Sequence, residues 1–376
     1  MNKKEISEIR RQYVPERCTI SRICGCYVDA EKNIKTTMKE AFLSLPEDDA
    51  FKYFSIFKKT LSGTIGRNLV NLDFPLDAER AGGHQEFLLK LRNSKLKDDV
   101  LVNEFYNRII KTFSFGENYY IILIHVAYDM PGKASDNTQM YDASNNVFEY
   151  LLCSLCPVHL SKPGLGYNEK KNSIENRIQD WIVDQPMMGF LFPAFNDRFT
   201  DIHSMLYYTK KSTDLQADFL KNMFGCSRIP LDADSQKESF NRLIVDTLGI
   251  DCNYKTLRTI HEILNDKIEE SKDNPEPLEI GKEDIRQLFQ DSGVPDSRME
   301  SFDQAYDENL GQHTTFLATN ITNPKNFSIE TPDVVVKVNP EATDLVETQI
   351  INGRQCLVIA INDHLEVNGI DVLFTK

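Results

Sequence analysis

Near the middle of the chain, two apolar runs of strand length stand on either side of a short polar segment. The first covers 189–195, and the second covers 202–209 and is rich in residues that favour strands. Two such runs joined by a polar loop predict neighbouring antiparallel strands. Ser212 or Thr213 is expected to cap a helix after them, and Gly225 is expected to end it. The pattern therefore predicts the centre of a sheet with a helix packed against it.

Two further runs predict strands in the interior of the same sheet. Segments 119–128 and 147–158 are almost continuously apolar, which is not typical of a sheet edge. Segment 17–29 alternates as a strand does, and 34–43 fits either its partner strand or the start of a helix. The polar stretch 130–146 between the two interior strands is expected to form a loop.

Helical periodicity flanks these strands on both sides. Apolar residues three or four apart predict helices before the strands at 47–61, 86–91 and 98–113, and after them at 235–248, 254–271, 280–292 and 295–309. The chain then turns to predicted strands, at 327–339, 344–351, 355–361 and 365–374. Asn352-Gly353 and Asn368-Gly369 are strong signals for type I′ hairpins among them.

Consecutive strands followed by consecutive helices favour the α+β class over a doubly wound fold. We therefore expect a central, mostly antiparallel sheet flanked by helices, followed by a helical segment and a small β-rich module. With roughly 150 residues per domain as a guide, the chain of 376 residues divides into an α+β core domain at 1–230, a helical segment at 231–311 and a C-terminal β-rich module at 312–376.

Composition narrows the class of protein. Hydrophobic residues make up 41% of the chain, enough for a large core, and the formal net charge is −14. So acidic a surface repels nucleic-acid phosphates unless a local basic patch overrides the net charge. The sequence has no run of about 20 apolar residues for a membrane span, and its charged N-terminus lacks the apolar core of a signal peptide. A cytoplasmic location is expected, and eight sparse cysteines fit its reducing conditions.

Four cysteines have spacings that zinc ligands can use, Cys24-x-Cys26 and Cys153-x-x-Cys156, and His159 lies close to the second pair. Both pairs fall in predicted strands rather than on the turns that carry zinc ligands. The first pair would project to one face of the sheet, and the second pair would project to opposite faces. Buried core cysteines are therefore the preferred interpretation, and no metal or cofactor is assigned.

The polar cluster beside the predicted central strands is the densest candidate for a ligand site. It consists of Asn196, Asp197, Arg198, Asp201 and His203. Carboxylates, a guanidinium and an imidazole at one strand end could position a ligand or carry out acid–base chemistry. The competing interpretation is a turn in which Asn and Asp bond their own backbone. No catalytic residue is assigned, because spacing alone indicates no arrangement of a nucleophile and a base.

Basic residues gather in two weak clusters. The first lies near the start of the chain and consists of Arg10, Arg11, Arg17 and Arg22. The second lies further along and consists of Lys90, Arg92, Lys95 and Lys97. Basic faces of helices are usually only solvated, but a minority of them contact nucleic acid.

Four segments carry a full-length resemblance to a known family. They are the opening MNKKEISEIRRQYVPERCTISRICGCYVD, LSGTIGRNL, GFLFPAFNDRFTDIHSMLYYT and the ending TPDVVVKVNPEATDLVETQIINGRQCLVIAINDHLEVNGI. On these segments the chain resembles a domain-of-unknown-function family found in anaerobic clostridial bacteria. The resemblance implies a bacterial cytoplasmic protein and brings no assigned activity. A fainter resemblance, in the order of the elements alone, is to the bacterial nucleoid-associated protein family.

Two functional hypotheses follow. The first is a non-enzymatic cytoplasmic binding or scaffold protein, associated with the nucleoid or with nucleic acid, because the sequence shows no signature of a metal, nucleotide or nucleophile site. The second is a hydrolase or small-ligand-binding enzyme that uses the polar cluster at 196–203, whose side chains would then converge in a pocket. Under the first hypothesis the partner is a protein or a nucleic acid, and assembly into a homo-oligomer stays open.

Overall fold

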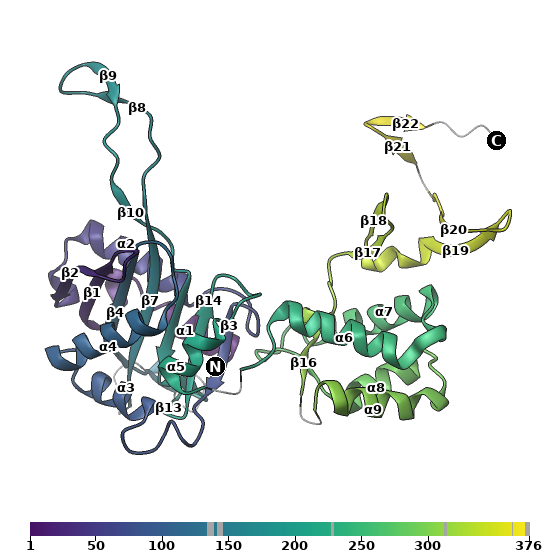
Figure 1. The fold of residues 1–376 in the computed structure, drawn as a ribbon, viewed down its shortest axis with the longest axis horizontal. Coiled ribbons are helices and arrows are strands. Elements are labelled where there is room, and N and C mark those ends of the chain that lie inside the picture. The colour runs from purple at the N-terminus through teal and green to yellow at the C-terminus, as the bar shows by residue number, and fades with distance from the viewer. Residues whose placement is uncertain (134–138, 141–145, 227–228, 312–313, 363, 373–376) are drawn as a thin grey trace. The chain divides into compact units, whose positions relative to one another are not determined.

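The computed structural model describes residues 1–133, 139–140, 146–226, 229–311, 314–362 and 364–372, and Figure 1 shows its ribbon. The chain divides into two compact units, Met1–Asp232 and Ala233–Lys376. The three-part division expected from the sequence, with a further boundary at 311/312, stays a prediction. Most of the predicted loop at 130–146 lies outside the described residues.

The first unit is built on an antiparallel sheet, to which eight strands of the described residues belong. Their order in space is β2 (Ile34–Glu40), β1 (Ile20–Val28), β4 (Tyr119–Asp129), β7 (Val147–Leu160), β11 (Met188–Phe192), β14 (Ser204–Thr209) and β3 (Leu69–Asp73), and β10 (Trp181–Val183) pairs with the far end of β7. Each of these pairs is antiparallel. The predicted α+β class with a central antiparallel sheet flanked by helices is confirmed.

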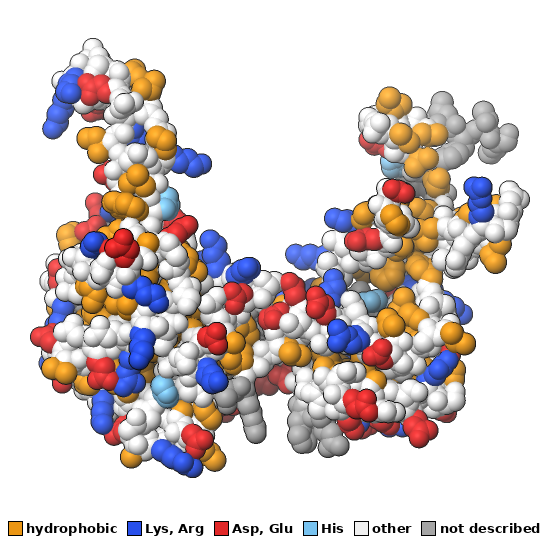
Figure 2. Space-filling model, viewed as in Figure 1, with side chains coloured by type: hydrophobic (Ala, Val, Ile, Leu, Met, Phe, Trp, Pro, Cys, Tyr) orange, Lys and Arg blue, Asp and Glu red, His pale blue; other side chains and the backbone are white. Residues whose placement is uncertain are grey.

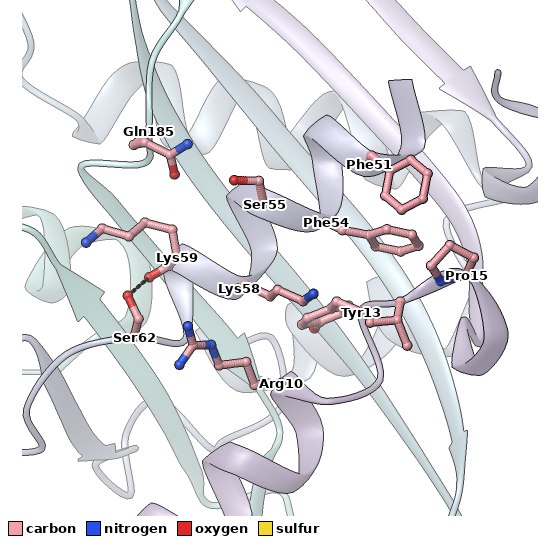
Figure 3. A pocket seen from close by; sticks show the side chains of 11 residues that line it. Arg10, Tyr13, Pro15, Phe51, Phe54, Ser55, Lys58, Lys59, Ser62 and Gln185 are labelled. Carbon is pink, nitrogen blue, oxygen red and sulfur yellow. Dashed lines mark hydrogen bonds between the residues drawn. The ribbon is translucent and has the colours of Figure 1, made fainter. Parts of the chain in front are cut away.

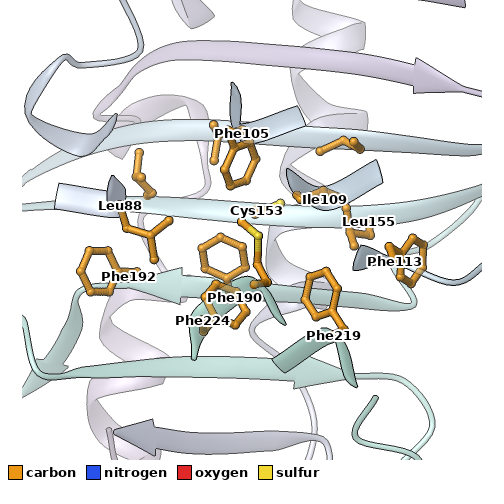
Figure 4. Packing of buried hydrophobic residues seen from close by; sticks show 14 of the residues in the cluster. Leu88, Phe105, Ile109, Phe113, Cys153, Leu155, Phe190, Phe192, Phe219 and Phe224 are labelled. Atoms are coloured by element: carbon orange, nitrogen blue, oxygen red, sulfur yellow. The ribbon is translucent and has the colours of Figure 1, made fainter. Parts of the chain in front are cut away.

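Helices cover both faces of the sheet, so the unit has two hydrophobic cores. Successive residues of β4 alternate between them: Ile121 and Leu123 join the first core, and Ile122 and Ile124 join the second. This double burial explains why 119–128 is almost continuously apolar. The first core packs against α3 (His84–Asn93), α4 (Asp99–Thr112) and α5 (Ala217–Phe224), and the second against α1 (Lys3–Arg10) and α2 (Glu47–Thr60). Figure 4 shows rings of α4 and α5 packed against β7 and β11 in the first core.

The end of α2 comes close to the central strands at Gly189 of β11. A Cβ at this position would lie 2.4 Å from the carbonyl oxygen of Cys153 and 2.6 Å from Cγ2 of Thr60 in α2. Thr60 Oγ1 and Ser154 Oγ of β7 share a hydrogen bond of 2.6 Å, and both side chains are buried. Because Gly189 has no side chain, the last turn of α2 can form this buried polar contact. The contact fixes the part of α2 that carries its two terminal lysines.

The predicted antiparallel pair in the middle of the chain is confirmed. β11 and β14 are neighbours in the sheet, with Leu191 opposite Leu206. The polar segment between them is itself a small hairpin, made of β12 (Ala194–Asn196) and β13 (Phe199–Asp201).

The helix after this pair begins later than predicted. A cap at Ser212 or Thr213 is wrong, because α5 begins at Ala217. The preceding Gln216 has a φ of 53°, outside the helical region, and its backbone N–H donates to Asp214 at 2.9 Å. Residues 211–216 therefore form a turn. The predicted stop at Gly225 is confirmed, since this residue caps α5 in the left-handed conformation.

The two edge strands of the sheet, β2 and β3, were not clearly predicted from the sequence. Segment 34–43, which fitted a strand or a helix, provides edge strand β2 as the partner of β1. At the other edge, β3 pairs with β14, although the sequence predicted no strand there. β3 has only five residues, and its polar Asn71 and Asp73 are exposed. So short a half-buried strand has little apolar signal.

The second unit starts with a helical core. It is formed by α6 (Ala233–Leu248), α7 (Tyr254–Glu270), α8 (Lys282–Asp291), α9 (Met299–Asn309) and α10 (Ala318–Ile321), with a short pair of β15 (Glu279–Ile280) and β16 (Phe316–Leu317). The four helices predicted for this region therefore correspond to α6–α9.

Strand pairs complete the second unit. They are β17 (Phe327–Glu330) with β18 (Val335–Val338), β19 (Val346–Ile351) with β20 (Arg354–Ile359), and β21 (Leu365–Val367) with β22 (Ile370–Val372), and in the described residues each pair is a separate two-stranded sheet. Asn352 and Asn368 have φ of 51°, and the glycine after each also has a positive φ, as a type I′ turn requires. The single strand predicted at 327–339 is wrong, because a turn at 331–334 folds it into a hairpin.

The first unit also contains small hairpins that do not belong to the large sheet. They are β5 (Gly132–Lys133) with β6 (Gln139–Met140), and β8 (Leu165–Asn168) with β9 (Ser173–Asn176).

Among the residues described, no helix is both long enough and apolar enough to cross a bilayer.

Candidate functional site

A hollow at the end of α1 is lined by side chains from both helices that cover the second core. Its volume is about 590 Å³. Figure 3 shows Arg10 of α1 on the same side as Lys59 of α2, and Phe51 and Phe54 at the other end of α2 beside Pro15. The other lining residues are Tyr13, Val14, Ser55, Lys58, Ser62 and Gln185.

The sequence of α1 explains how Arg10 comes to face this hollow. The helix begins with a capping box, in which the Asn2 side chain accepts from the Glu5 backbone and the Glu5 side chain accepts from the Asn2 backbone. Ile6 and Ile9 are buried in the second core. The apolar stripe thus sets the rotation of the helix, and Arg10 is left exposed.

α2 supplies both aromatic and basic groups to the hollow. Phe54 and Phe57 are buried, whereas Phe51 at the start of the helix is 48% exposed. Lys58 and Lys59 occupy the last turn, where the helix dipole favours cations. The same helix therefore presents an exposed ring at one end and two positive charges at the other.

Two further hollows continue the first one around α1. The second has a volume of about 630 Å³ and shares Arg10 and Lys58 with the first, and the third has about 510 Å³ and shares Arg11 and Arg17 with the second. Among the described residues that line the three, the cationic side chains are Lys4, Arg10, Arg11, Arg17, Lys58 and Lys59. We call this set the basic surface.

The six cations of the basic surface form no described ion pair, although Glu16 and Asp129 also line its hollows. Within the described part of the chain, none of its six cations has a carboxylate partner within 4 Å. Glu8 lines the third hollow, but both of its carboxylate oxygens accept from Arg198 at 2.8 Å. By contrast, Lys90 and Lys95 of the other basic cluster are paired with carboxylates. A region of positive charge therefore stands on a chain whose net charge is −14.

Two residues of the predicted polar cluster hold α1 in place. Asp197 and Arg198 form the turn between β12 and β13, with φ of 50° and 61°. The Asp197 backbone N–H donates to Glu5 at 2.7 Å, and the Arg198 guanidinium donates to Glu8 and to the carbonyl oxygen of Pro131. They connect the sheet to the helix that carries Lys4 and Arg10 of the basic surface.

The other three residues of the polar cluster bond one another or nearby loops. Asn196 donates to Asp201 at 2.7 Å, and Asp201 also accepts from the Ser204 hydroxyl and the His203 backbone. Partial burial opposes ionisation of Asp201, but the hydrogen bonds from Ser204 and Asn196 outweigh it and lower its pKa. The exposed His203 ring bonds Glu79 at 2.8 Å, and this bond raises the pKa of His203.

The structure thus gathers Asn196, Asp197, Arg198, Asp201 and His203 in and beside one hairpin. The side chains of four of them bond protein partners, and Asp197 does so through its backbone N–H. None of the five lines the three hollows around α1. Their assignment as ligand-binding residues stays a prediction.

Nearly the whole chain matches one family. A model whose description reads "Domain of unknown function (DUF4317)" covers residues 1–370. The chain belongs to the DUF4317 family. No curated protein and no solved structure matches this DUF4317 chain. The predicted membership of a domain-of-unknown-function family is confirmed, whereas a clostridial origin and the likeness to nucleoid-associated proteins stay predictions.

The cysteines of the DUF4317 chain that had zinc-like spacing are in its hydrophobic cores. Cys24, Cys26 and Cys153 belong to the first core and Cys156 to the second, and all four are free and buried. Burial raises the pKa of Cys24 to about 11 and that of Cys26 to about 12. Because zinc binds the thiolate, such burial opposes metal binding. The core interpretation of these cysteines is confirmed.

Among the described residues of this DUF4317 protein, one group of three side chains could meet around a metal ion: His364, Glu366 and Asp371 at the β21–β22 hairpin. All three are exposed to solvent, as are many acidic groups that hold no ion, and they are not assigned as a metal site.

Sequence reasoning found half of the basic surface of this DUF4317 protein. It grouped Arg10, Arg11 and Arg17 by their position near the start of the chain. Lys58 and Lys59 join them only through the packing of α1 and α2 on the second core. The available signal was the Lys-Lys pair in the last turn of an otherwise apolar-faced helix, which is also typical of a solvated helix end.

Proposed function

We propose that this DUF4317 protein is a cytoplasmic, non-enzymatic binding protein whose basic surface holds the phosphate backbone of a nucleic acid. The observation that carries the proposal is the set of six cations around three connected hollows, none paired with a described carboxylate, on a chain of net charge −14. Leaving cations unpaired on an acidic protein favours an anionic ligand at that place. The free state of all eight cysteines fits a reducing compartment.

The series of hollows favours a polymer over a small anion. A single anion needs one converging set of donors, whereas these cations are spread over α1, the segment that follows it and the last turn of α2. Successive phosphates of one strand match such a distribution of charge. Phe51, exposed on the rim of the first hollow, offers a face on which a base can stack. Single strands are therefore the favoured form.

Fluorescence anisotropy with a labelled oligonucleotide, single-stranded and as a duplex, tests the proposal over a series of salt concentrations. We expect the affinity to fall steeply with salt, with a slope of log K against log salt as large as about −4 if all six cations meet phosphates of a single strand. Lys59→Glu should weaken binding to every sequence and reduce the magnitude of that slope by about 1.

Lys111→Glu provides the matched control. Lys59 and Lys111 are both exposed and both occupy the second-last position of a helix of 14 residues, but Lys111 ends α4 on the other face of the sheet. The two variants therefore change the net charge and the helix end in the same way. Absent or salt-insensitive binding by the wild type, or equal losses in the two variants, would contradict the proposal.

A further inference from the structure

The sheet of the first unit continues into a two-stranded arm. β7 runs on to Leu160, the chain continues outward through β8 to the tip, and it returns through β9 and β10 (Figure 1). Trp181 lies opposite Leu160 and Asn176 lies opposite Leu165, so the pairing at the root and the pairing at the tip are in register, although 161–164 and 177–180 between them are not strands. Backbone bonds between Ser161 and Asp180 and between Gly164 and Arg177 connect the two segments in between. We call Pro157–Asp184 the arm.

One face of the arm is apolar and exposed. Because side chains alternate along a strand, this pairing places Leu165, Tyr167, Ile174, Ile178 and Ile182 on one face, which the polar Asn176 and Asp180 share. The exposed fractions of the five apolar residues are 75%, 60%, 64%, 83% and 39%. Near the root, the exposed Leu160 and Trp181 lie on the opposite face. At the tip, the opposite face is polar and satisfied within itself, since Asn168 and Ser173 both donate to Glu175. The arm is thus an amphipathic ribbon whose apolar face nothing in the described chain covers.

We propose that this apolar face packs against the same face of a second copy of the chain. A two-stranded ribbon with an uncovered apolar face is at best marginally stable in water, which calls for a partner layer. Aromatic side chains bury about 150–250 Å² each; with the lower end of that range for these mostly aliphatic residues, the exposed fractions amount to roughly 500 Å² per arm. Two arms would then bury roughly 1,000 Å² in total, about the minimum for a specific interface.

The charges of the arm favour a second copy over the other candidate partners. The arm carries four cations, Lys162, Lys170, Lys171 and Arg177, and four carboxylates, Glu169, Glu175, Asp180 and Asp184. A neutral ribbon gives no attraction to nucleic-acid phosphates, unlike the basic surface. It also imposes no net repulsion when two identical arms meet, and each sign on one arm finds its opposite on the other.

The length of the arm meets the main objection to self-association, which is the repulsion between two chains of net charge −14. Asn168 at the tip is eight positions beyond Leu160 along the chain. At about 3.3 Å per residue this segment extends for roughly 26 Å. Contact through the arms keeps the two acidic sheet bodies apart by more than the Debye length of about 8–10 Å, so their charges are largely screened.

Sedimentation equilibrium of the full chain tests this proposal. We expect the wild type to be a dimer of the 43.2 kDa chain. Ile178→Glu should raise the dimer dissociation constant at least about a hundredfold, because both copies then bury a charge in the apolar contact. Ile250→Glu is the control, since Ile250 is 94% exposed on the second unit and the change is chemically the same.

A wild type that stays monomeric, a dimer that Ile178→Glu leaves intact, or equal weakening by Ile250→Glu would overturn the proposal. Circular dichroism of each variant shows whether it is folded, and Tyr167→Lys provides a second substitution on the same face if Ile178→Glu does not fold. The result is independent of nucleic-acid binding, because no residue of the arm belongs to the basic surface.

Discussion

Replacing Phe190 with alanine is expected to lower the free energy of unfolding of the first unit by about 3–5 kcal/mol. Phe190 is 1% exposed on β11, with its ring centroid 4.9 Å from that of Phe224 in α5 and 6.2 Å from that of Phe105 in α4. Removing the ring leaves a cavity where two helices meet the sheet, as Figure 4 shows. Urea denaturation followed by circular dichroism would measure the loss.

Phe199→Ala serves as the control for this cavity. Phe199 is 66% exposed in the β12–β13 hairpin, so its removal should change the free energy of unfolding by no more than about 0.5 kcal/mol. Comparable losses in the two variants would show that the first core is not packed around Phe190.

His125 should make the stability of the first unit depend on pH below about 6.5. Its ring is fully buried in β4, with Nδ1 2.7 Å from the Ser21 hydroxyl and Nε2 3.9 Å from Glu149. Burial lowers its pKa to about 4, although the Glu149 carboxylate acts in the opposite direction, while Lys95 and Arg92 lower it further. An unfolded chain holds the same imidazole near its ordinary pKa of about 6.5.

Acid lowers the stability of the first unit because the unfolded chain takes up a proton on His125 more readily than the folded chain does. Between pH 6.5 and 4 the unfolded state binds the proton and the folded state does not, so acid favours unfolding. The difference of about 2.5 pKa units corresponds to about 3 kcal/mol, present above pH 6.5 and lost as the pH falls to 4. Denaturation curves of wild type and His125→Leu across this range should therefore converge or cross as the pH falls.

His159→Leu is the control for the imidazole effect. Its ring is exposed beside Asp184 on the arm, so this variant removes an imidazole without changing the buried cores. A His125→Leu protein whose stability falls with acid as steeply as that of the wild type would refute the assignment.

The interior of the sheet could be predicted from the sequence because burial on both faces leaves a direct trace. The runs at 119–128 and 147–158 have no polar face, and the structure places them as adjacent strands between the two cores. The Asn-Gly turns were equally predictable, because few other residues adopt positive φ at both positions of a type I′ turn.

The arm could not be predicted in this way. Its apolar residues alternate with Gly, Asn and charged residues at 161–180, and that composition is also typical of a loop. Only its pairings, in register at the root and at the tip, show that it is a ribbon. The periodicity of apolar residues reflects burial. A strand pair that no other part of its own chain covers therefore shows only a weak apolar pattern in the sequence.

The candidate site was only half predictable for a related reason. The density of polar residues at 196–203 is visible in the sequence, but the direction of each side chain is not. Arg198 reaches Glu8, which is 190 positions away. The sequence therefore indicated the position of the hairpin that supports α1. It gave a weaker indication of the cations on α1.

The strand order of the first unit has a consequence for the arm that joins its halves. β11 and β14, which follow the arm, are inserted between β7 and β3, which precede it. Cleavage of the chain at the arm tip would give two fragments. In the sheet, β11 and β14 of the second fragment would still be hydrogen-bonded on both sides to strands of the first fragment, β7 and β3. The order of the strands, and not covalent continuity through the tip, therefore holds the two parts of the sheet together.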